Sequence, residues 1–294
     1  MQEYESPKGY YYVQRKEPST PVTTKVKHSD IYKDPKLFYG TLIGYIKTLK
    51  PLCFTQNLFK FQNEKPTYLL QREAGKIVLP GSQLKGAIKT YMQALSESYD
   101  EEIEKNPTKI KSDPVNSITG RGKYASRLLF NDIIIDEKKV KTEIIDGKQQ
   151  WSQKLNNRYP SIRLYSHNDH EDLDHKVLFE VLPTKTYLDF EILIKGLTKV
   201  EMGLLFLAMG IVPKYRFDLK IGRGKNLDMG SVRFTPLELI QPNKSFNNAK
   251  KVYAEKELAQ YIYSCGKAYL KKMSEENKKN LYKIIDDTKR SDDK

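Results

Sequence analysis

Two lysines and two small residues lie together at the start of one predicted helix. An apolar run at residues 77–79 ends in a Pro-Gly-Ser turn whose serine, Ser82, is a good helix N-cap. Lys85 and Lys89 then lie four residues apart on one helix face, and Gly86 leaves room for close approach. Because a helix N-terminus carries partial positive charge, this arrangement favours binding of an anion such as phosphate.

Further basic side chains lie in two glycine-bearing turns and in one long irregular segment. They are Arg121, Lys123 and Arg127 in the first turn, Arg158 and Arg163 in the irregular segment, and Arg223 and Lys225 in the second turn. Such side chains form either a clamp on a sugar–phosphate backbone or an ordinary flexible basic loop.

The charge balance favours a polyanionic partner. Lysine and arginine total 51 against 37 acidic residues, a net charge of +14, although a generally lysine-rich proteome would also produce this excess. The 20 tyrosines suit stacking on unpaired bases, but tyrosines also fill strands.

One acidic segment gathers three of the four histidines. His167, His170 and His175 alternate there with the carboxylates Asp169, Asp172 and Asp174. The group could hold zinc or another divalent ion, but its spacing fits no standard zinc finger and no cysteine is near. A solvated acidic loop is therefore the favoured interpretation, no metal site is predicted, and the aspartates are the candidates if the chain catalyses a reaction.

Cysteine use and hydropathy point to the cytoplasm. Cys53 and Cys265 are far apart and match no metal spacing, which is typical of a reducing compartment. No signal peptide is evident, and no apolar stretch approaches the roughly 20 residues that cross a bilayer. We expect a cytoplasmic protein with no membrane partner.

The order of predicted elements indicates an α+β fold. After an extended arm, residues 1–36, the chain alternates strands with two helices, as in a ferredoxin-like antiparallel sheet with helices on one face. This domain spans 37–240 and carries an irregular insertion at about 137–176; a lysine-rich helical segment follows at 241–294. The predicted strands lie at 37–50, 77–79, 128–135, 177–182, 187–194 and 230–234, with a hairpin between the fourth and fifth, and the helices lie at 82–98, 200–209 and from 247 onward.

Four segments, in order, resemble motifs of the RAMP superfamily of CRISPR proteins. Residues 80–86 resemble its "IPGSSLKG" motif, 127–132 "RLxFxD" and 179–191 "ExVPAGTxFxFE". Residues 222–230 resemble its C-terminal glycine-rich loop in degenerate form.

Within that superfamily the chain looks most like the backbone subunits of type III effector complexes. The resemblance implies an RRM-like core that binds guide RNA (crRNA) beside target RNA and other effector subunits, without a cofactor. It also implies a thumb, placed at 137–176, that kinks the guide–target duplex. The residues expected to contact RNA are Ser82, Lys85, Gly86, Lys89, Arg121, Lys123, Arg127, Arg158, Arg163, Arg223 and Lys225.

The chain departs from the family's nucleases at two points. The loop after the first strand has no histidine, which argues against a guide-processing nuclease, since His28 precedes that strand. Residues 52–79 contain no aspartate, only Glu64 and Glu73, where target-cutting subunits carry their catalytic aspartate. We therefore expect a scaffold role. The alternative is a metal-dependent endoribonuclease that cuts target RNA with a differently placed acid and Mg²⁺.

Overall fold

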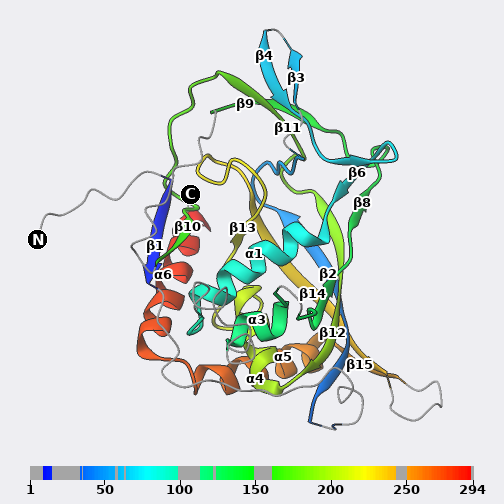
Figure 1. Ribbon diagram of the computed structural model, residues 1–294, viewed down its shortest axis with the longest axis vertical. Helices are drawn as coiled ribbons and strands as arrows, with labels where there is room; N and C mark the ends of the chain where they lie inside the picture. Colours follow the sequence, from blue (N-terminus) through cyan, green and yellow to red (C-terminus); the bar gives the residue numbers. More distant parts are fainter. Residues whose placement is uncertain are drawn as a thin grey trace, which may run out of the picture.

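The framework of the protein is an antiparallel sheet built around one long strand (Figure 1). The computed structural model describes residues 9–14, 34, 36–56, 59–62, 64–98, 113–121, 124–148, 161–242 and 250–292, without the side chains of 290–292. Across this sheet the strands run β13-β14-β2-β12-β7, and β15 pairs with β14. Their bounds are β2 (Phe38–Thr48), β7 (Leu128–Phe130), β12 (Tyr187–Leu197), β13 (Leu219–Lys220), β14 (Ser231–Pro242) and β15 (Lys250–Ala254).

Alternation along β2 explains why one face of this sheet is covered. Every second residue of β2, including Leu42 and Ile46, is buried, while Tyr45 and the other intervening residues are partly exposed. Since successive strand side chains point to opposite faces, the buried set faces the helices. The strand predicted at residues 37–50 is thus confirmed as β2.

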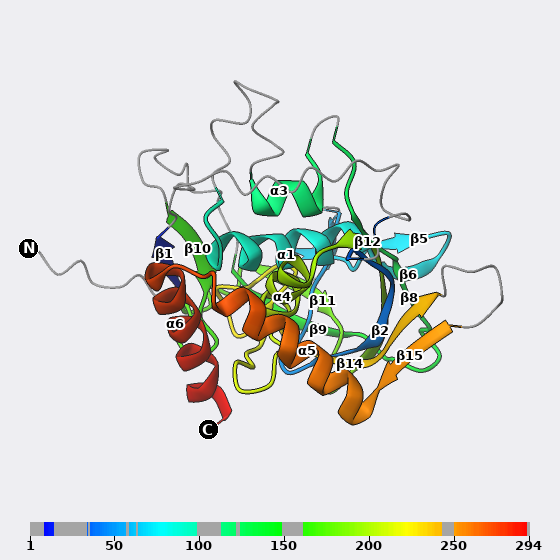
Figure 2. The ribbon, with the colours of Figure 1, turned by 90° about the horizontal axis from the view of Figure 1, so that it is seen from below.

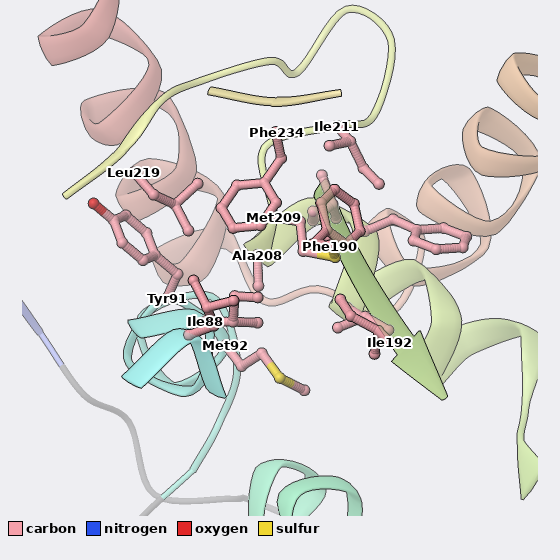
Figure 3. Close-up of a cluster of buried hydrophobic side chains, with 14 of the residues drawn as sticks. Ile88, Tyr91, Met92, Phe190, Ile192, Ala208, Met209, Ile211, Leu219 and Phe234 are labelled. Atoms are coloured by element: carbon pink, nitrogen blue, oxygen red, sulfur yellow. The ribbon is translucent and has the colours of Figure 1, made fainter. Parts of the chain in front are cut away.

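The helices pack against that covered face. They are α1 (Gly81–Ala94), α3 (Pro114–Thr119), α4 (Lys199–Ala208), α5 (Glu255–Leu270) and α6 (Glu275–Asp292). Figure 2 shows α1, α4 and α5 on one side of β2 and β12. In Figure 3, Ile88 and Met92 of α1 face Phe190 and Ile192 of β12 across a continuous apolar core. The predicted α+β class is confirmed.

Three smaller sheets surround this body. Strand β1 pairs with β10, β5 and β8 flank β6, and a four-stranded sheet runs β3-β4-β11-β9, with β11 parallel to β4. In Figure 1 the β3–β4 hairpin projects from the end of the molecule. The bounds are β1 (Tyr10–Gln14), β3 (Phe59–Gln62), β4 (Lys65–Tyr68), β5 (Arg72–Glu73), β6 (Lys76–Leu79), β8 (Ile133–Ile135), β9 (Glu143–Gly147), β10 (Ser161–Tyr165) and β11 (Val177–Val181).

Three expected elements differ in the structure. The predicted strand 128–135 is two strands, β7 and β8, in different sheets. The predicted hairpin 177–194 is wrong, because β11 pairs with β4 and β9 whereas β12 pairs with β2 and β7. The C-terminal segment begins with β15 before its two helices, so the expected single helix from residue 247 is also wrong.

The described part of the insertion at 137–176 contributes strands to two sheets. Strand β9 lies at the edge of the four-stranded sheet, and β10 pairs with β1 of the N-terminal arm. Residues 149–160 lie outside the described residues, so the thumb expected there stays a prediction.

Candidate nucleic-acid interface

The start of α1 is closed by a carboxylate of the protein itself. The backbone N–H of Gly81 donates to Asp132 Oδ1 at 2.7 Å, and the N-cap is Pro80, which supplies no side-chain hydrogen bond. Ser82, expected as the cap, is instead an exposed residue inside the first turn. A Cβ on Gly81 would lie 2.1 Å from the carbonyl oxygen of Phe130, so this glycine serves close packing of helix on strand. The partial positive charge at the N-terminus of α1 is therefore balanced by the carboxylate of Asp132.

The outward face of α1 presents the expected basic group. Ser82 and Gly86 are exposed and Lys85 and Lys89 are partly exposed, while the opposite face is buried. A Cβ on Gly86 would meet nothing within 4 Å, so a ligand can approach the helix backbone there. The Nζ of Lys89 donates to Asn116 Oδ1 of α3 at 2.9 Å, which fixes where its charge lies.

The glycine-rich turn places its cations on aromatic rings. The Cζ of Arg223 lies 3.9 Å from the Tyr68 ring centroid, and Lys225 Nζ lies 5.0 Å from that of Tyr165. Gly222 has φ +79°, and a Cβ there would lie 2.1 Å from the carbonyl oxygen of Cys53, so only glycine fits without strain. Both cations are partly exposed, and burial lowers the pKa of Lys225.

Lys220, at the root of this turn, lies inside the protein. Its Nζ donates to the carbonyl of Met229 at 2.9 Å, and burial lowers its pKa to about 8. Its backbone N–H donates to the hydroxyl of Tyr91 at 3.2 Å. Since Tyr91 belongs to α1, this bond ties the glycine-rich turn to the helix that carries Lys85 and Lys89.

Arg127 corrects the sequence interpretation. It was expected to contact RNA, but it is fully buried, and its guanidinium donates to the carboxylate of Glu201 and the carbonyls of Ser117 and Gly196. The guanidinium of Arg127 thus links α3, α4 and β12 inside the protein. A sequence alone cannot separate such an internal arginine from an RNA-binding one, because both lie beside glycine-bearing loops.

The other expected cations are scattered. Arg121 is partly exposed and forms two backbone hydrogen bonds with Tyr124. The guanidinium of Arg163 lies 4.6 Å from the Tyr10 ring centroid, so it helps to hold β1 on β10. Lys123 and Arg158 lie outside the described residues.

The three histidines of the acidic segment share no partner. His167 is buried: its Nε2 lies 3.2 Å from the carbonyl oxygen of Asp218, and its Nδ1 lies 3.0 Å from Ser231 Oγ. His170 and His175 reach the carboxylates of Asp228 and Asp146. Among the residues that the structure describes, no three histidine, cysteine, aspartate or glutamate side chains converge as metal ligands.

The candidate aspartates lie on the same segment without forming a common group. Asp169 accepts a hydrogen bond from the backbone N–H of Gly9, and Asp174 accepts one from the backbone N–H of Lys176, while Asp172 is exposed. The segment as a whole is held to α6, because Asp287 accepts hydrogen bonds from Ser166 Oγ at 2.6 Å and from the His167 N–H at 2.9 Å.

Sequence reasoning missed a charged cluster beside the glycine-rich turn. Asp228 accepts hydrogen bonds from Lys50 Nζ at 2.7 Å and from His170 Nε2 at 3.1 Å. Burial would raise the pKa of Asp228, but these two hydrogen bonds outweigh it and hold that pKa well below its usual range. The three residues are more than 50 positions apart, so their spacing in the sequence does not predict that they meet.

The fold is that of an α+β protein, with basic side chains on the outward face of α1 and in the glycine-rich turn. A family model, that of the RAMP superfamily, matches residues 45–289, and the chain belongs to this superfamily of RNA-binding, CRISPR-associated proteins. A search of curated proteins found no match. Within the described ranges, no helix combines the length and apolarity needed to span a bilayer.

Proposed function

We propose that this chain is a guide-RNA-binding backbone subunit of a type III CRISPR effector complex, acting in the cytoplasm. Its partners would be guide RNA, target RNA and the other effector subunits. The observation that carries the proposal is the outward face of α1, where Lys85 and Lys89 flank the open position Gly86. Lysines on such a face bind phosphates without reading bases, so any guide sequence would be accepted.

The strand order supports an RRM-like core. The chain order β2-α1-β7-β12-α4-β14 and the sheet order β14-β2-β12-β7 are those of a split βαβ fold. In this arrangement α1 is the first helix after the first core strand, and it carries both lysines soon after the turn at residues 80–82. Arg223 and Lys225 would extend the phosphate contacts, since the Tyr91–Lys220 hydrogen bond anchors their turn to α1.

We favour a scaffold role over target cleavage. Residues 52–79 contain no aspartate, and the described part of this range includes β3, β4, β5 and β6. Binding would need no cofactor, whereas cleavage by carboxylates would need Mg²⁺. The purified complex, given target RNA with and without Mg²⁺, separates the two roles. Mg²⁺-dependent cutting that is lost on changing Asp169, Asp172 or Asp174 to alanine would favour the nuclease.

The central test removes both lysines of α1. We expect Lys85→Ala with Lys89→Ala to weaken RNA binding equally for unrelated sequences, because phosphate contacts carry no sequence information. The slope of log affinity against log salt should fall by roughly 0.7 for each phosphate of single-stranded RNA that a lysine no longer neutralises. Filter binding or fluorescence anisotropy across a salt series measures both quantities.

The matched control removes two lysines from another helix. Lys267→Ala with Lys271→Ala has the same spacing and charge change at exposed positions of α5 and its C-cap. It should leave the salt slope unchanged. Because Lys89 bonds Asn116, Lys85→Ala alone and a melting curve guard against a folding effect. Full affinity and an unchanged slope in the double α1 variant would refute the assignment.

A further inference from the structure

A row of rings crosses the four-stranded sheet on one face. In register, Phe59 of β3 lies beside Tyr68 of β4, then Phe179 of β11, then Ile145 of β9. Side chains in register on neighbouring strands share a face. The Phe59 and Tyr68 ring centroids are 5.9 Å apart, and Tyr68 stacks on Phe179 at 5.6 Å and 23°. The rings thus form one continuous apolar file.

The glycine-rich turn covers only the inner end of this file. Leu227 and Met229 pack with Phe179 in a small buried cluster, separate from the main core. Arg223 lies at the edge of the cover, 3.9 Å from the Tyr68 centroid and 5.9 Å from that of Phe179. Arg223 therefore lies where the buried part of the row of rings ends.

The outer end of the row is uncovered. Phe59 is 51% exposed, and Phe61 next along the same face is 72% exposed, their ring centroids 5.7 Å apart. All four residues of β3 are exposed, so none of its side chains is buried. Figure 1 shows the β3–β4 hairpin projecting away from the central sheet. Two large apolar rings held in water at the end of a hairpin are unfavourable unless something stacks on them.

We propose that Phe59 and Phe61 stack on unpaired bases of the bound RNA. The inference rests on the proposed function, because the RNA is the one held by α1. Three observations favour a nucleic-acid base over a protein surface as the occupant. The exposed row consists of flat rings, Arg223 at its edge can meet the phosphate of a stacked nucleotide, and the chain carries a net charge of +14. Ring-on-base stacking accepts any base, as a guide-binding subunit requires.

The test replaces ring character while keeping the side chains apolar. Full-length protein with Phe59→Leu and Phe61→Leu should bind single-stranded RNA on the order of tenfold more weakly for each base left unstacked. Phe59→Trp with Phe61→Trp should retain or improve the affinity. An RNA with 2-aminopurine at unpaired positions should be quenched by the wild type and by the Trp pair but not by the Leu pair.

The control is an exposed aromatic residue elsewhere. Tyr282→Leu on α6, where Tyr282 is 54% exposed, should change neither affinity nor quenching. Unchanged RNA affinity and quenching in the Leu pair, beside a loss in the Lys85→Ala, Lys89→Ala variant, would overturn this inference alone. Loss of co-purifying effector subunits in the Leu pair, with RNA binding intact, would identify a protein-docking surface and also overturn it. A wild-type chain that binds no RNA would overturn both proposals.

Discussion

The central sheet and the four-stranded sheet bury their aromatic rings to very different extents. On the central sheet, Phe190 and Phe234 meet edge to face at 5.4 Å and are almost fully buried beneath the helices. On the four-stranded sheet the row begins with buried Phe179 and ends with exposed Phe59. The same residue type thus builds a core in one place and a surface in the other. The central sheet thus buries its rings in the main core, while the outer rings of the four-stranded sheet form the surface that we propose for base stacking.

The largest expected difference between the two regions concerns their arginines. Arg127→Ala should destabilise the protein by about 3–5 kcal/mol, because the carboxylate of Glu201 would be left buried without its cationic partner. Arg223→Ala, beside the four-stranded sheet, should cost much less stability because Arg223 is partly exposed. Chemical denaturation measures both. Equal effects from the two variants would break the comparison, and recovery of stability in Arg127→Met with Glu201→Leu would sharpen it.

The histidines allow the two regions to be compared through the pH dependence of stability. Burial, helped by the nearby charge of Lys220, lowers the pKa of His167 from 6.5 to about 3, so the folded state needs neutral imidazole. The unfolded chain takes up a proton below pH 6.5 and the folded one only near pH 3. Stability from this group is therefore complete above pH 6.5 and is lost as the pH falls towards 3, by about 2 kcal/mol at pH 5.

Unfolding curves at pH 7 and pH 5 measure this loss. The wild type should lose about 2 kcal/mol more than His167→Gln over this interval. His175→Gln is the matched variant at the four-stranded sheet, where His175 is 61% exposed beside Asp146. This variant keeps His167, so the loss of stability that His167 causes between pH 7 and pH 5 should persist in it. A wild-type loss that persists in His167→Gln would assign the effect to other groups.

The smallest expected effect is the difference in unfolding free energy between alanine substitutions of two glycines of α1. Gly86→Ala should raise the unfolding free energy by about 0.5–1 kcal/mol, since alanine favours helix and the site is open. Gly81→Ala should lower it, because its Cβ would lie 2.1 Å from the Phe130 carbonyl oxygen of the central sheet. Thermal melts of both variants check the signs. If Gly86→Ala also weakens RNA binding while stabilising the fold, the helix face is confirmed as a contact.

Local patterns in the sequence were enough for several elements. The alternation along Phe38–Thr48 predicted β2, and the apolar spacing of Leu84, Ile88 and Met92 predicted α1 to within a few residues. The four motifs predicted the superfamily, which the family match confirms. These predictions succeed because periodicity and motif order are properties of short stretches.

Predictions that depended on distant partners were less reliable. Residues 128–135 have the composition of one strand, but the strand is interrupted at residues 131–132, where Asp132 accepts a hydrogen bond from Gly81 at the start of α1, 51 positions earlier. Arg127 has the sequence context of a basic loop, yet it binds Glu201 from the following helix. The alternating Phe59-Lys60-Phe61 run was a signal that could have indicated an exposed strand, and only its place at the end of a projecting sheet gives it meaning.

The sequence by itself determined the family, the α+β class and the lysines on the outer face of α1, because these follow from residue order and helical spacing. Only the tertiary structure decided which charges remain available. Burial and pairing withdraw Arg127 and His167 from the surface, whereas the incomplete cover of the glycine-rich turn leaves Phe59 and Phe61 in water. The physical reason is that solvent exposure is set by contacts between residues far apart in the chain, which no local pattern specifies.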